Sequence, residues 1–198
     1  MSSESQIAFA AAALRRGEVI VYPTETVYGL GADPFSEQAV RRLYAIKERD
    51  GANPVLLIVD GMDQLGEVVR EVSAAAAAYA QRFWPGPLSM LFPKSPRLPD
   101  VLTGGQDKIC VRWTSHPVAR MLCREVGHAI TSTSANISGQ PPARSPAEVK
   151  LEGLGAMIDG GVLPPSAPST VFDPETGRIL REGAVSAEDL LKLQADSQ

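Results

Sequence analysis

Short apolar runs rich in β-branched residues alternate with amphipathic helical stretches along the whole 198-residue chain. Runs of this kind predict buried strands, and an apolar period near 3.6 predicts helices that cover them. Strands mixed with helices throughout predict a layered α/β (α+β) domain on one twisted sheet flanked by helices. The last strands follow one another too closely for parallel crossovers, so we expect a mixed sheet.

The expected elements follow from these patterns and from capping and turn residues. We expect strands at 18–22, from Pro54 onward, and at 88–92, 109–113, 129–132, 157–158, 170–172 and 179–180. We expect helices at 7–14, 37–48, 63–72, 74–83 and 116–126, and one after Ser186. Residues 23–34 and 139–145 are expected to be loops, and no linker divides the chain.

Composition and charge exclude several classes of protein. The formal charge is -4 and the pI is near 5.3, which argues against a dedicated nucleic-acid binder. Apolar runs such as 55–59 are far shorter than the about 20 residues that span a bilayer. Glu4 precedes the apolar segment 7–14 and Arg15 and Arg16 follow it, which is the reverse of a signal peptide. We therefore expect a cytoplasmic protein without a membrane span.

The two cysteines do not form a disulfide framework. Cys110, His116, Cys123 and His128 occur in an order that resembles a zinc site. Structural zinc sites normally present paired ligands two to four residues apart, and these residues lie farther apart. We expect no metal held by the protein.

Two loops of the first half carry polar residues that a packed core does not need. Residues 22–31 (YPTETVYGLG) combine hydroxyls, a carboxylate and glycines that let a ligand approach the backbone. A capped turn is the simpler alternative. Lys47 and Arg49, at a helix end, suit a polyphosphate, because one is a point charge and the other a bidentate fork. The alternative is that they complement the helix dipole.

Two further loops lie in the second half. Residues 131–139 (TSTSANISG) offer backbone N–H groups and short donors, as phosphate-binding nests do, although a serine-rich turn is the alternative. The Walker and Gly-x-Gly-x-x-Gly patterns are absent from the sequence. The second of these loops combines residues 168–170 and 181–183, which by themselves are only a weak indication of a ligand site. Since there is no Gly-x-Ser-x-Gly elbow, no covalent nucleophile is indicated.

Taken together and in order, these segments resemble the Sua5/YciO/YrdC family. The resemblance covers about residues 7–187 and rests on 23–30, on Lys47-x-Arg49 with Asn53-Pro54, on 84–87, on Val111-Arg112, on 134–139, and on 169–171 with Leu180-Arg181. It implies a single YrdC-like domain over 1–198, with a core of about 7–187 and a central concave cavity. The chain is similar to the short form of the family, which lacks an extra C-terminal domain.

The best-known members of that family are L-threonylcarbamoyladenylate synthases. The resemblance implies an enzyme, a nucleotidyltransferase that makes threonylcarbamoyl-AMP and pyrophosphate from L-threonine, bicarbonate (or CO2) and ATP. The product serves the threonylcarbamoyl modification of adenosine 37 in tRNA. The resemblance also implies that ATP is a substrate accompanied by Mg²⁺, and that tRNA and tRNA-modifying transferase proteins are weak or transient downstream partners.

Site residues carry over from the family motifs position by position. Lys47 and Arg49 are implied to be catalytic. The implied ATP-binding residues are Lys47, Arg49, Asn53, Lys108, Ser134, Asn136 and Arg181. The implied threonine-binding residues are Thr26, Arg112, Ser132 and Ser169. For Arg112, which we expect to point away from the core with Val111 pointing inward, a surface ion pair is the alternative.

Two departures from the family pattern keep a second reading open. Ile58 stands where some relatives carry a histidine, and Asp50 and Gly51 replace a Pro-containing stretch. Both departures favour a YciO-like paralogue, either a nucleotide- or RNA-binding module or an enzyme acting on a different adenylate.

Overall fold

The computed structural model describes residues 2–48 and 54–196, and for 194–196 only the backbone. The helices are α1 (Ser3–Arg15), α2 (Glu37–Lys47), α3 (Met62–Val68), α4 (Ala74–Phe83), α5 (Pro117–Val126) and α6 (Ala187–Asp196), with 3₁₀ turns η1 (Asp100–Thr103) and η2 (Pro146–Glu148). The strands are β1 (Ile20–Pro23), β2 (Tyr28–Gly31), β3 (Leu56–Val59), β4 (Leu88–Pro93), β5 (Lys108–Trp113), β6 (Ile130–Ser134), β7 (Ala156–Met157), β8 (Thr170–Asp173) and β9 (Arg178–Arg181).

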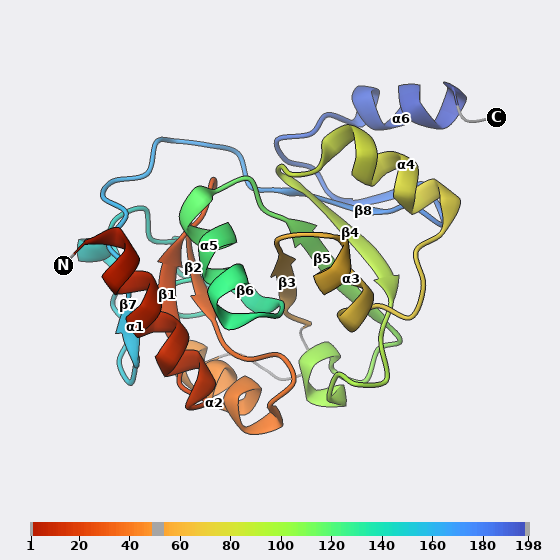
Figure 1. The fold of residues 1–198 in the computed structure, drawn as a ribbon. Coiled ribbons are helices and arrows are strands. Elements are labelled where there is room, and N and C mark those ends of the chain that lie inside the picture. The colour runs from red at the N-terminus through yellow and green to blue at the C-terminus, as the bar shows by residue number, and fades with distance from the viewer. Residues whose placement is uncertain (1, 49–53, 197–198) are drawn as a thin grey trace.

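These nine strands of the described residues form one mixed sheet in the order β7-β1-β2-β6-β3-β5-β4-β8-β9. β3 pairs with β5 in parallel, whereas β4 pairs with β5 and β6 with β3 in antiparallel fashion. Figure 1 shows α1 beside the β7–β1 end and α4 and α6 at the β4–β8 end. The predicted mixed α/β sheet flanked by helices is therefore confirmed.

Each face of the sheet has its own apolar core. On one face, side chains of α2, α3 and α4 pack on strand residues such as Val21, Leu57 and Val111. On the other face, α1 and α5 cover Ile20, Tyr22 and Ile58. These two helices cover part of that face, and polar residues of the strands lie farther along it. Burying both faces supplies the main favourable term in folding.

One predicted loop is partly wrong. Within 23–34, residues Tyr28–Gly31 form β2, which pairs with β1 on one side and β6 on the other. The glycines, interpreted from the sequence as letting a ligand approach the backbone, have a packing reason. A Cβ atom on Gly31 would lie 2.8 Å from Cε1 of Tyr22, so only glycine lets that ring lie across the strand. The predicted helix at 63–72 is also shorter, since α3 ends at Val68.

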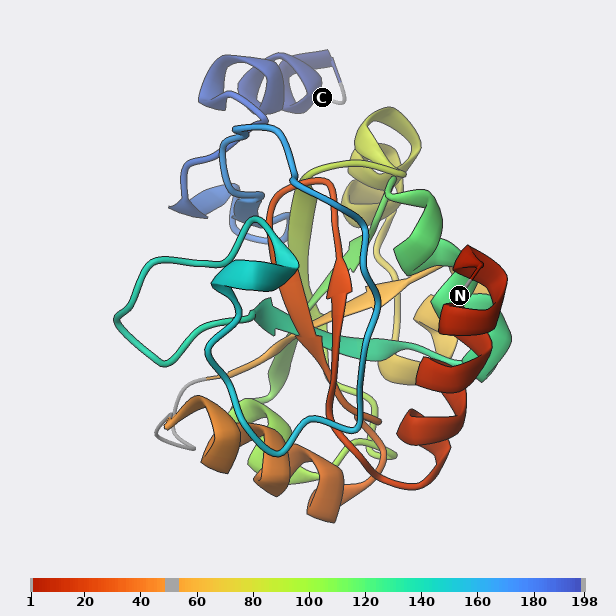
Figure 2. The ribbon, with the colours of Figure 1, turned by 90° about the vertical axis from the view of Figure 1, so that its left-hand side faces the viewer.

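The connection from β7 to β8 passes over β1 and β2 (Figure 2). It is tied there by hydrogen bonds from the Tyr28 hydroxyl to the Gly161 carbonyl (2.7 Å) and from the Ser166 hydroxyl to the Thr26 carbonyl (3.1 Å). The connection from β7 to β8, although far away in the sequence, therefore holds the loop that joins β1 and β2 in place.

Candidate functional site

Strand register places most predicted site residues on one face of the sheet. Ser132 pairs with Leu56, and Ile58, two residues on, pairs with Arg112. Across β4, Ser89 pairs with Val171, which pairs with Arg181. Since side chains alternate along a strand, register partners and residues two apart share a face. Ser132, Ser134, Arg112, Ser169 and Arg181 therefore project from the same face.

The nucleotide half of the predicted site is organised around Lys47. Its ammonium group donates to the Ser134 carbonyl (2.6 Å) and the Asn136 carbonyl (2.9 Å), and also to Oδ1 of Asn136 (3.1 Å). The Lys47 side chain is buried, with the residue 3% exposed. The last residue of α2 thus holds the 134–136 loop in place.

Asn136 shapes the same loop from its other end. Its amide nitrogen donates to the carbonyls of Ile137 (2.9 Å) and Gln140 (2.6 Å) while Oδ1 accepts from Lys47. These bonds fold the loop after β6 into a compact turn. Arg49 and Asn53, predicted to contact ATP beside it, lie outside the described residues.

Arg112, at the end of β5, forms an ion pair rather than standing free. Its Nη1 lies 3.1 Å from Oε1 of Glu25, and its side chain is 4% exposed. The surface ion pair considered from sequence is thus a buried one. Its Nε is buried and has no hydrogen-bond partner among the described residues. A buried unpaired donor is costly, so this atom points to a ligand.

Ser169 and Arg181 form a second polar group on the same face. The Arg181 guanidinium donates to the Ser169 carbonyl through Nε (3.1 Å) and Nη2 (2.9 Å), and Nη2 also donates to the Ser169 hydroxyl (3.0 Å). Ser169 in turn accepts from the buried Ser89 hydroxyl (2.9 Å). Burial, together with the nearby charge of Arg112, lowers the pKa of Arg181. Two guanidiniums in one neighbourhood favour an anionic ligand.

The other two hydroxyl residues predicted for threonine, besides Ser169, lie in the loop between β1 and β2 and on β6. Thr26 is buried in the loop between β1 and β2, where its hydroxyl lies 3.1 Å from that of Thr24. Ser132 lies on β6 next to Tyr22, whose own hydroxyl donates to the Thr131 carbonyl (2.9 Å). Burial raises the pKa of Tyr22, while a hydrogen bond with Ser132 opposes the rise.

Lys108, the weakest of the predicted ATP contacts, lies at the start of β5. Its ammonium group forms a 2.6 Å ion pair with Oδ2 of Asp173 on β8. An ATP contact by Lys108 stays a prediction, and the structure adds a role in joining these strands.

Two residues were not predicted for this site. Glu25 was read only as part of a polar loop, yet its carboxylate receives hydrogen bonds from Arg112, from the Thr114 hydroxyl (2.6 Å) and from the Ser115 N–H (3.4 Å). His116, at the start of α5, lies near both charges. Burial lowers the pKa of His116, with Glu25 raising it and Arg112 lowering it. No sequence signal pairs position 25 with positions 112–116.

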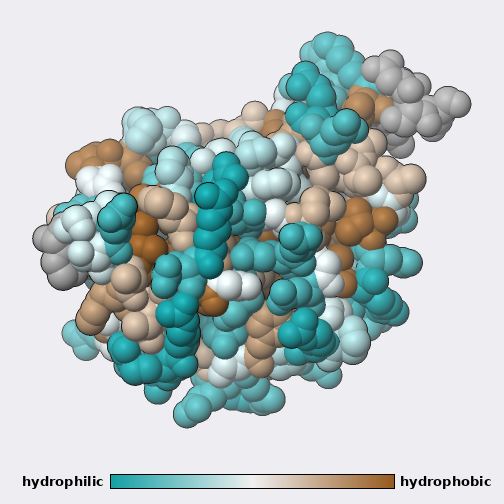
Figure 3. Space-filling model, viewed as in Figure 1, coloured by the Kyte–Doolittle hydropathy of each residue, from teal (hydrophilic) through white to brown (hydrophobic). Residues whose placement is uncertain are grey.

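Other features of the described residues lie outside this site. In residues 2–48 and 54–196, no group of three or more His, Cys, Asp or Glu is arranged to hold a metal ion. Within the same ranges, no helix is long and apolar enough to cross a membrane. On the face shown in Figure 3, apolar patches are small and separated by polar residues.

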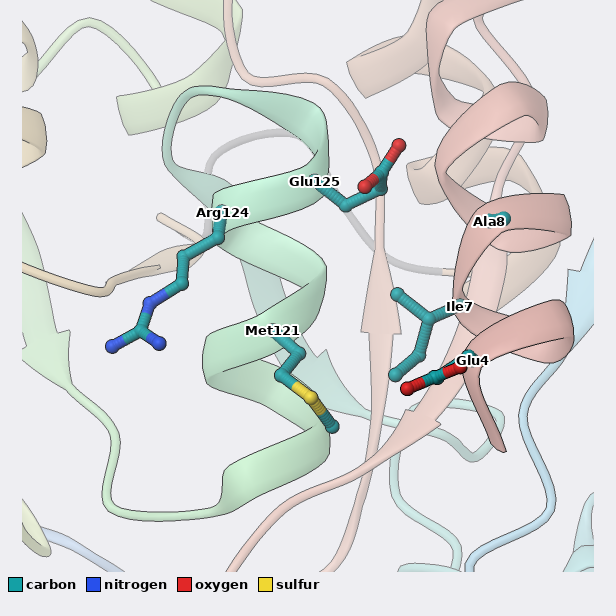
Figure 4. A pocket seen from close by; sticks show the side chains of 6 residues that line it. All are labelled: Glu4, Ile7, Ala8, Met121, Arg124 and Glu125. Atoms are coloured by element: carbon teal, nitrogen blue, oxygen red, sulfur yellow. The ribbon is translucent and has the colours of Figure 1, made fainter. Parts of the chain in front are cut away.

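A depression of about 280 Å³ lies between α1 and α5 (Figure 4). It is lined by Glu4, Ile7, Ala8, Met121, Arg124 and Glu125. None of these is a predicted site residue, and the depression is separate from the polar sheet face.

Comparison with known proteins identifies the class of protein that this fold and polar face define. The Sua5/YciO/YrdC family model, described as "Telomere recombination", matches residues 12–183. The chain belongs to the Sua5/YciO/YrdC family, which confirms the resemblance.

Two relatives within this family carry the same name. The chain is 45% identical over 171 residues to the threonylcarbamoyl-AMP synthase of Thiobacillus denitrificans, covering 85% of this chain and 90% of the relative. It is 41% identical over 183 residues to the threonylcarbamoyl-AMP synthase of Methylococcus capsulatus, covering 89% and 96%. These relatives carry the name of an enzyme, as the sequence predicted.

Solved structures agree on the fold. P. abyssi Sua5 complexed with L-threonine is similar at a TM-score of 0.90 and 37% identity, covering 98% of this chain and 58% of that one. E. coli YciO is similar at a TM-score of 0.83 and 26% identity, covering 96% and 94%.

Proposed function

We propose that this chain is a threonylcarbamoyl-AMP synthase, joining L-threonine, bicarbonate (or CO2) and ATP into threonylcarbamoyl-adenylate and pyrophosphate. The observation that carries the proposal is the buried Arg112 guanidinium, on a polar sheet face shared with Ser132, Ser169 and Arg181. Within residues 2–48 and 54–196, its Nε has no hydrogen-bond partner. Relatives 38–45% identical with this name and a threonine-bound structural neighbour support it.

The threonine half of the site uses Arg112 as its anchor. A planar guanidinium holds a carboxylate by parallel N–H bonds and fixes both distance and direction. The hydroxyls of Thr26 and Ser132 then recognise the threonine side chain, and Ser169 closes the pocket beside Arg181.

The nucleotide half is the loop held by Lys47. Ser134 and Asn136 bind the phosphates, and Arg181 reaches them from β9. Arg49 and Asn53 complete the phosphate contacts, with Lys108 a weaker one. Lys47 contributes its positive charge to the phosphates, and a direct contact exchanges one of the N–H bonds that anchor the loop.

The chemistry needs positioning more than acid–base groups. The threonine amine is carboxylated to a carbamate, one of whose oxygens attacks the α-phosphate in line while pyrophosphate leaves. Cations that neutralise the phosphates and hold the reacting atoms in line supply most of the catalysis. Mg²⁺ arrives with ATP, coordinated mainly by phosphate oxygens and water.

The product is a reactive adenylate that transferase proteins use on adenosine 37 of tRNA. We expect those partners to be transient and the protein to work in the cytoplasm as a single domain. The net charge of -4 predicts weak binding to bulk tRNA that fades steeply with added salt.

Incubation with labelled bicarbonate, ATP and L-threonine tests the proposal. We expect pyrophosphate release that requires both threonine and bicarbonate, and label in a threonylcarbamoyl-adenylate product. ATP turnover indifferent to threonine would favour a YciO-like enzyme acting on a different adenylate. No turnover together with nucleotide or RNA binding would favour a binding module.

One observation favours a YciO-like paralogue over the synthase. Ile58, at the place where some relatives carry a histidine, is fully buried and is the register partner of Arg112. The identities of 41% and 45% to named synthases, against 26% to YciO, favour the synthase.

A further inference from the structure

Glu25 is held in place by three donors from the end of β5 and from the loop that leads to α5. They are Nη1 of Arg112, the Thr114 hydroxyl and the Ser115 N–H. The Glu25 side chain is 16% exposed, so its carboxylate is largely removed from water. A carboxylate with three protein donors is oriented rather than free to turn.

In the part of the chain that the structure describes, Nε of Arg112 has no hydrogen-bond partner. The guanidinium presents its five N–H groups as a planar fork. Glu25 takes Nη1 at one end of the fork, while Nε lies on the edge that it shares with Nη2. The Nε edge is therefore the edge of Arg112 at which a second carboxylate would bind while Glu25 stays on Nη1.

The net positive charge around this edge matches one singly charged anion. Arg112 and Arg181 each contribute a positive charge to this neighbourhood, and Glu25 contributes one negative charge. The three groups sum to +1. A ligand with a single carboxylate neutralises this excess.

We propose that Glu25 is a positioning residue that holds Arg112 with its Nε edge turned toward the carboxylate of the amino-acid substrate. This inference rests on the proposed function. It assigns Glu25 an effect on amino-acid binding through Arg112, and none on ATP.

Steady-state kinetics of Glu25→Gln test it, with threonine and ATP varied separately. The substitution keeps the size of the side chain and removes its charge. We expect the KM for threonine to rise by roughly tenfold, because Arg112 is held less firmly and its charged hydrogen bond to the substrate carboxylate is weakened. The KM for ATP should stay within about twofold of wild type. Glu37→Gln, which removes the carboxylate of an exposed pair with Arg41, is the matched control and should change neither.

A double-mutant cycle with Arg112→Lys separates positioning from a general structural effect. If Glu25 acts through Arg112, Glu25→Gln should add little to the threonine KM once Arg112 is lysine. Calorimetric binding of threonine gives the same comparison for variants that turn over slowly, and thermal melting shows which of them are folded.

Several results would overturn the inference. They are an unchanged or lowered threonine KM in Glu25→Gln, equal rises in both KM values with a lowered melting temperature, and additive effects in the cycle. A wild-type protein without threonine-dependent pyrophosphate release would instead refute the proposed function, which is a separate outcome.

Discussion

The ammonium group of Lys47 lies 2.6 Å from the main-chain carbonyl oxygen of Ser134, although 87 residues separate them in the chain. This bond joins the end of α2 to the loop after β6. The phosphate-binding segments proposed for the first and second halves of the chain therefore form one unit, and loss of either should affect the other.

Lys47→Met should lower both stability and ATP affinity. The substitution leaves the oxygens of Ser134 and Asn136 without their donor, which costs roughly 1–3 kcal/mol. For a domain of this size we expect a fall in melting temperature of about 2–12 °C. Thermal unfolding and ATP calorimetry measure the two effects, with Lys150→Met, at an exposed lysine, as the control. Weaker ATP binding with unchanged melting would show that Lys47 does not anchor the loop.

Arg112→Lys should weaken threonine use and leave ATP binding unchanged. Lysine keeps the positive charge but lacks the planar fork and the Nε donor. We expect a loss of about ten- to a hundredfold in kcat/KM for threonine. Threonine titrations of pyrophosphate release, at saturating ATP, measure this loss. An unchanged threonine dependence would remove Arg112 from the site.

Wild-type protein should prefer threonine to serine and serine to valine. Serine keeps the hydroxyl that Thr26 and Ser132 are proposed to recognise, whereas the valine methyl leaves buried donors unpaired. Pyrophosphate release with each amino acid in turn gives the order. Equal use of valine and threonine would argue for the paralogue with a different substrate.

Asp60→Asn should destabilise the fold without affecting the site. The Asp60 carboxylate, whose side chain is 3% exposed, pairs with both Arg120 and Arg124 of α5. An amide in its place offers one acceptor and introduces donors facing guanidiniums, so we expect a loss of roughly 1–3 kcal/mol. Urea unfolding measures the loss, and an unfolding free energy equal to that of wild type would contradict it.

Gly31→Ala should destabilise the protein, while Gly66→Ala should not. A Cβ on Gly31 meets the Tyr22 ring at 2.8 Å, and overpacking of this kind costs about 1–3 kcal/mol. A Cβ on Gly66, within α3, meets nothing within 4 Å, and alanine there should stabilise by up to about 1 kcal/mol. Thermal melting of the two variants side by side gives the comparison. Equal melting temperatures would show that the strand can move away from Tyr22.

Lys108→Met should lower stability at neutral pH and have less effect in acid. Burial raises the pKa of Asp173, but hydrogen bonds from Lys108 and from the Glu175 N–H outweigh it, so the folded pKa lies below the ordinary value. The stability gained is therefore present above about pH 4 and is lost as the pH falls through the lower, folded pKa. Because Lys108 is partly exposed, we expect about 1 kcal/mol or less. Denaturant unfolding of wild type and variant from pH 7 to 2 measures this loss. A difference in unfolding free energy that grows toward pH 2 would refute the pairing.

Sequence alone determined the fold class, most elements and the family. Period-2 and period-3.6 patterns are local, so the strand at 109–113 and the helix after Ser36 appear within a residue or two of their predicted ends. The ordered motifs also placed Ser132, Ser134, Arg112, Ser169 and Arg181 in a common site, and the strand register puts these five on one face.

Tertiary structure alone decided which of these groups touch. From the sequence, the glycines of β2 are interpreted as room for a ligand, and only strand pairing on both sides and the Tyr22 ring show their packing role. A lysine at a helix end is normally solvated, and Lys47 is buried because a loop 87 residues away supplies oxygens for it. The pairing of Glu25 with Arg112 likewise joins residues 87 apart. Such contacts depend on long-range burial and charge, which no local pattern encodes.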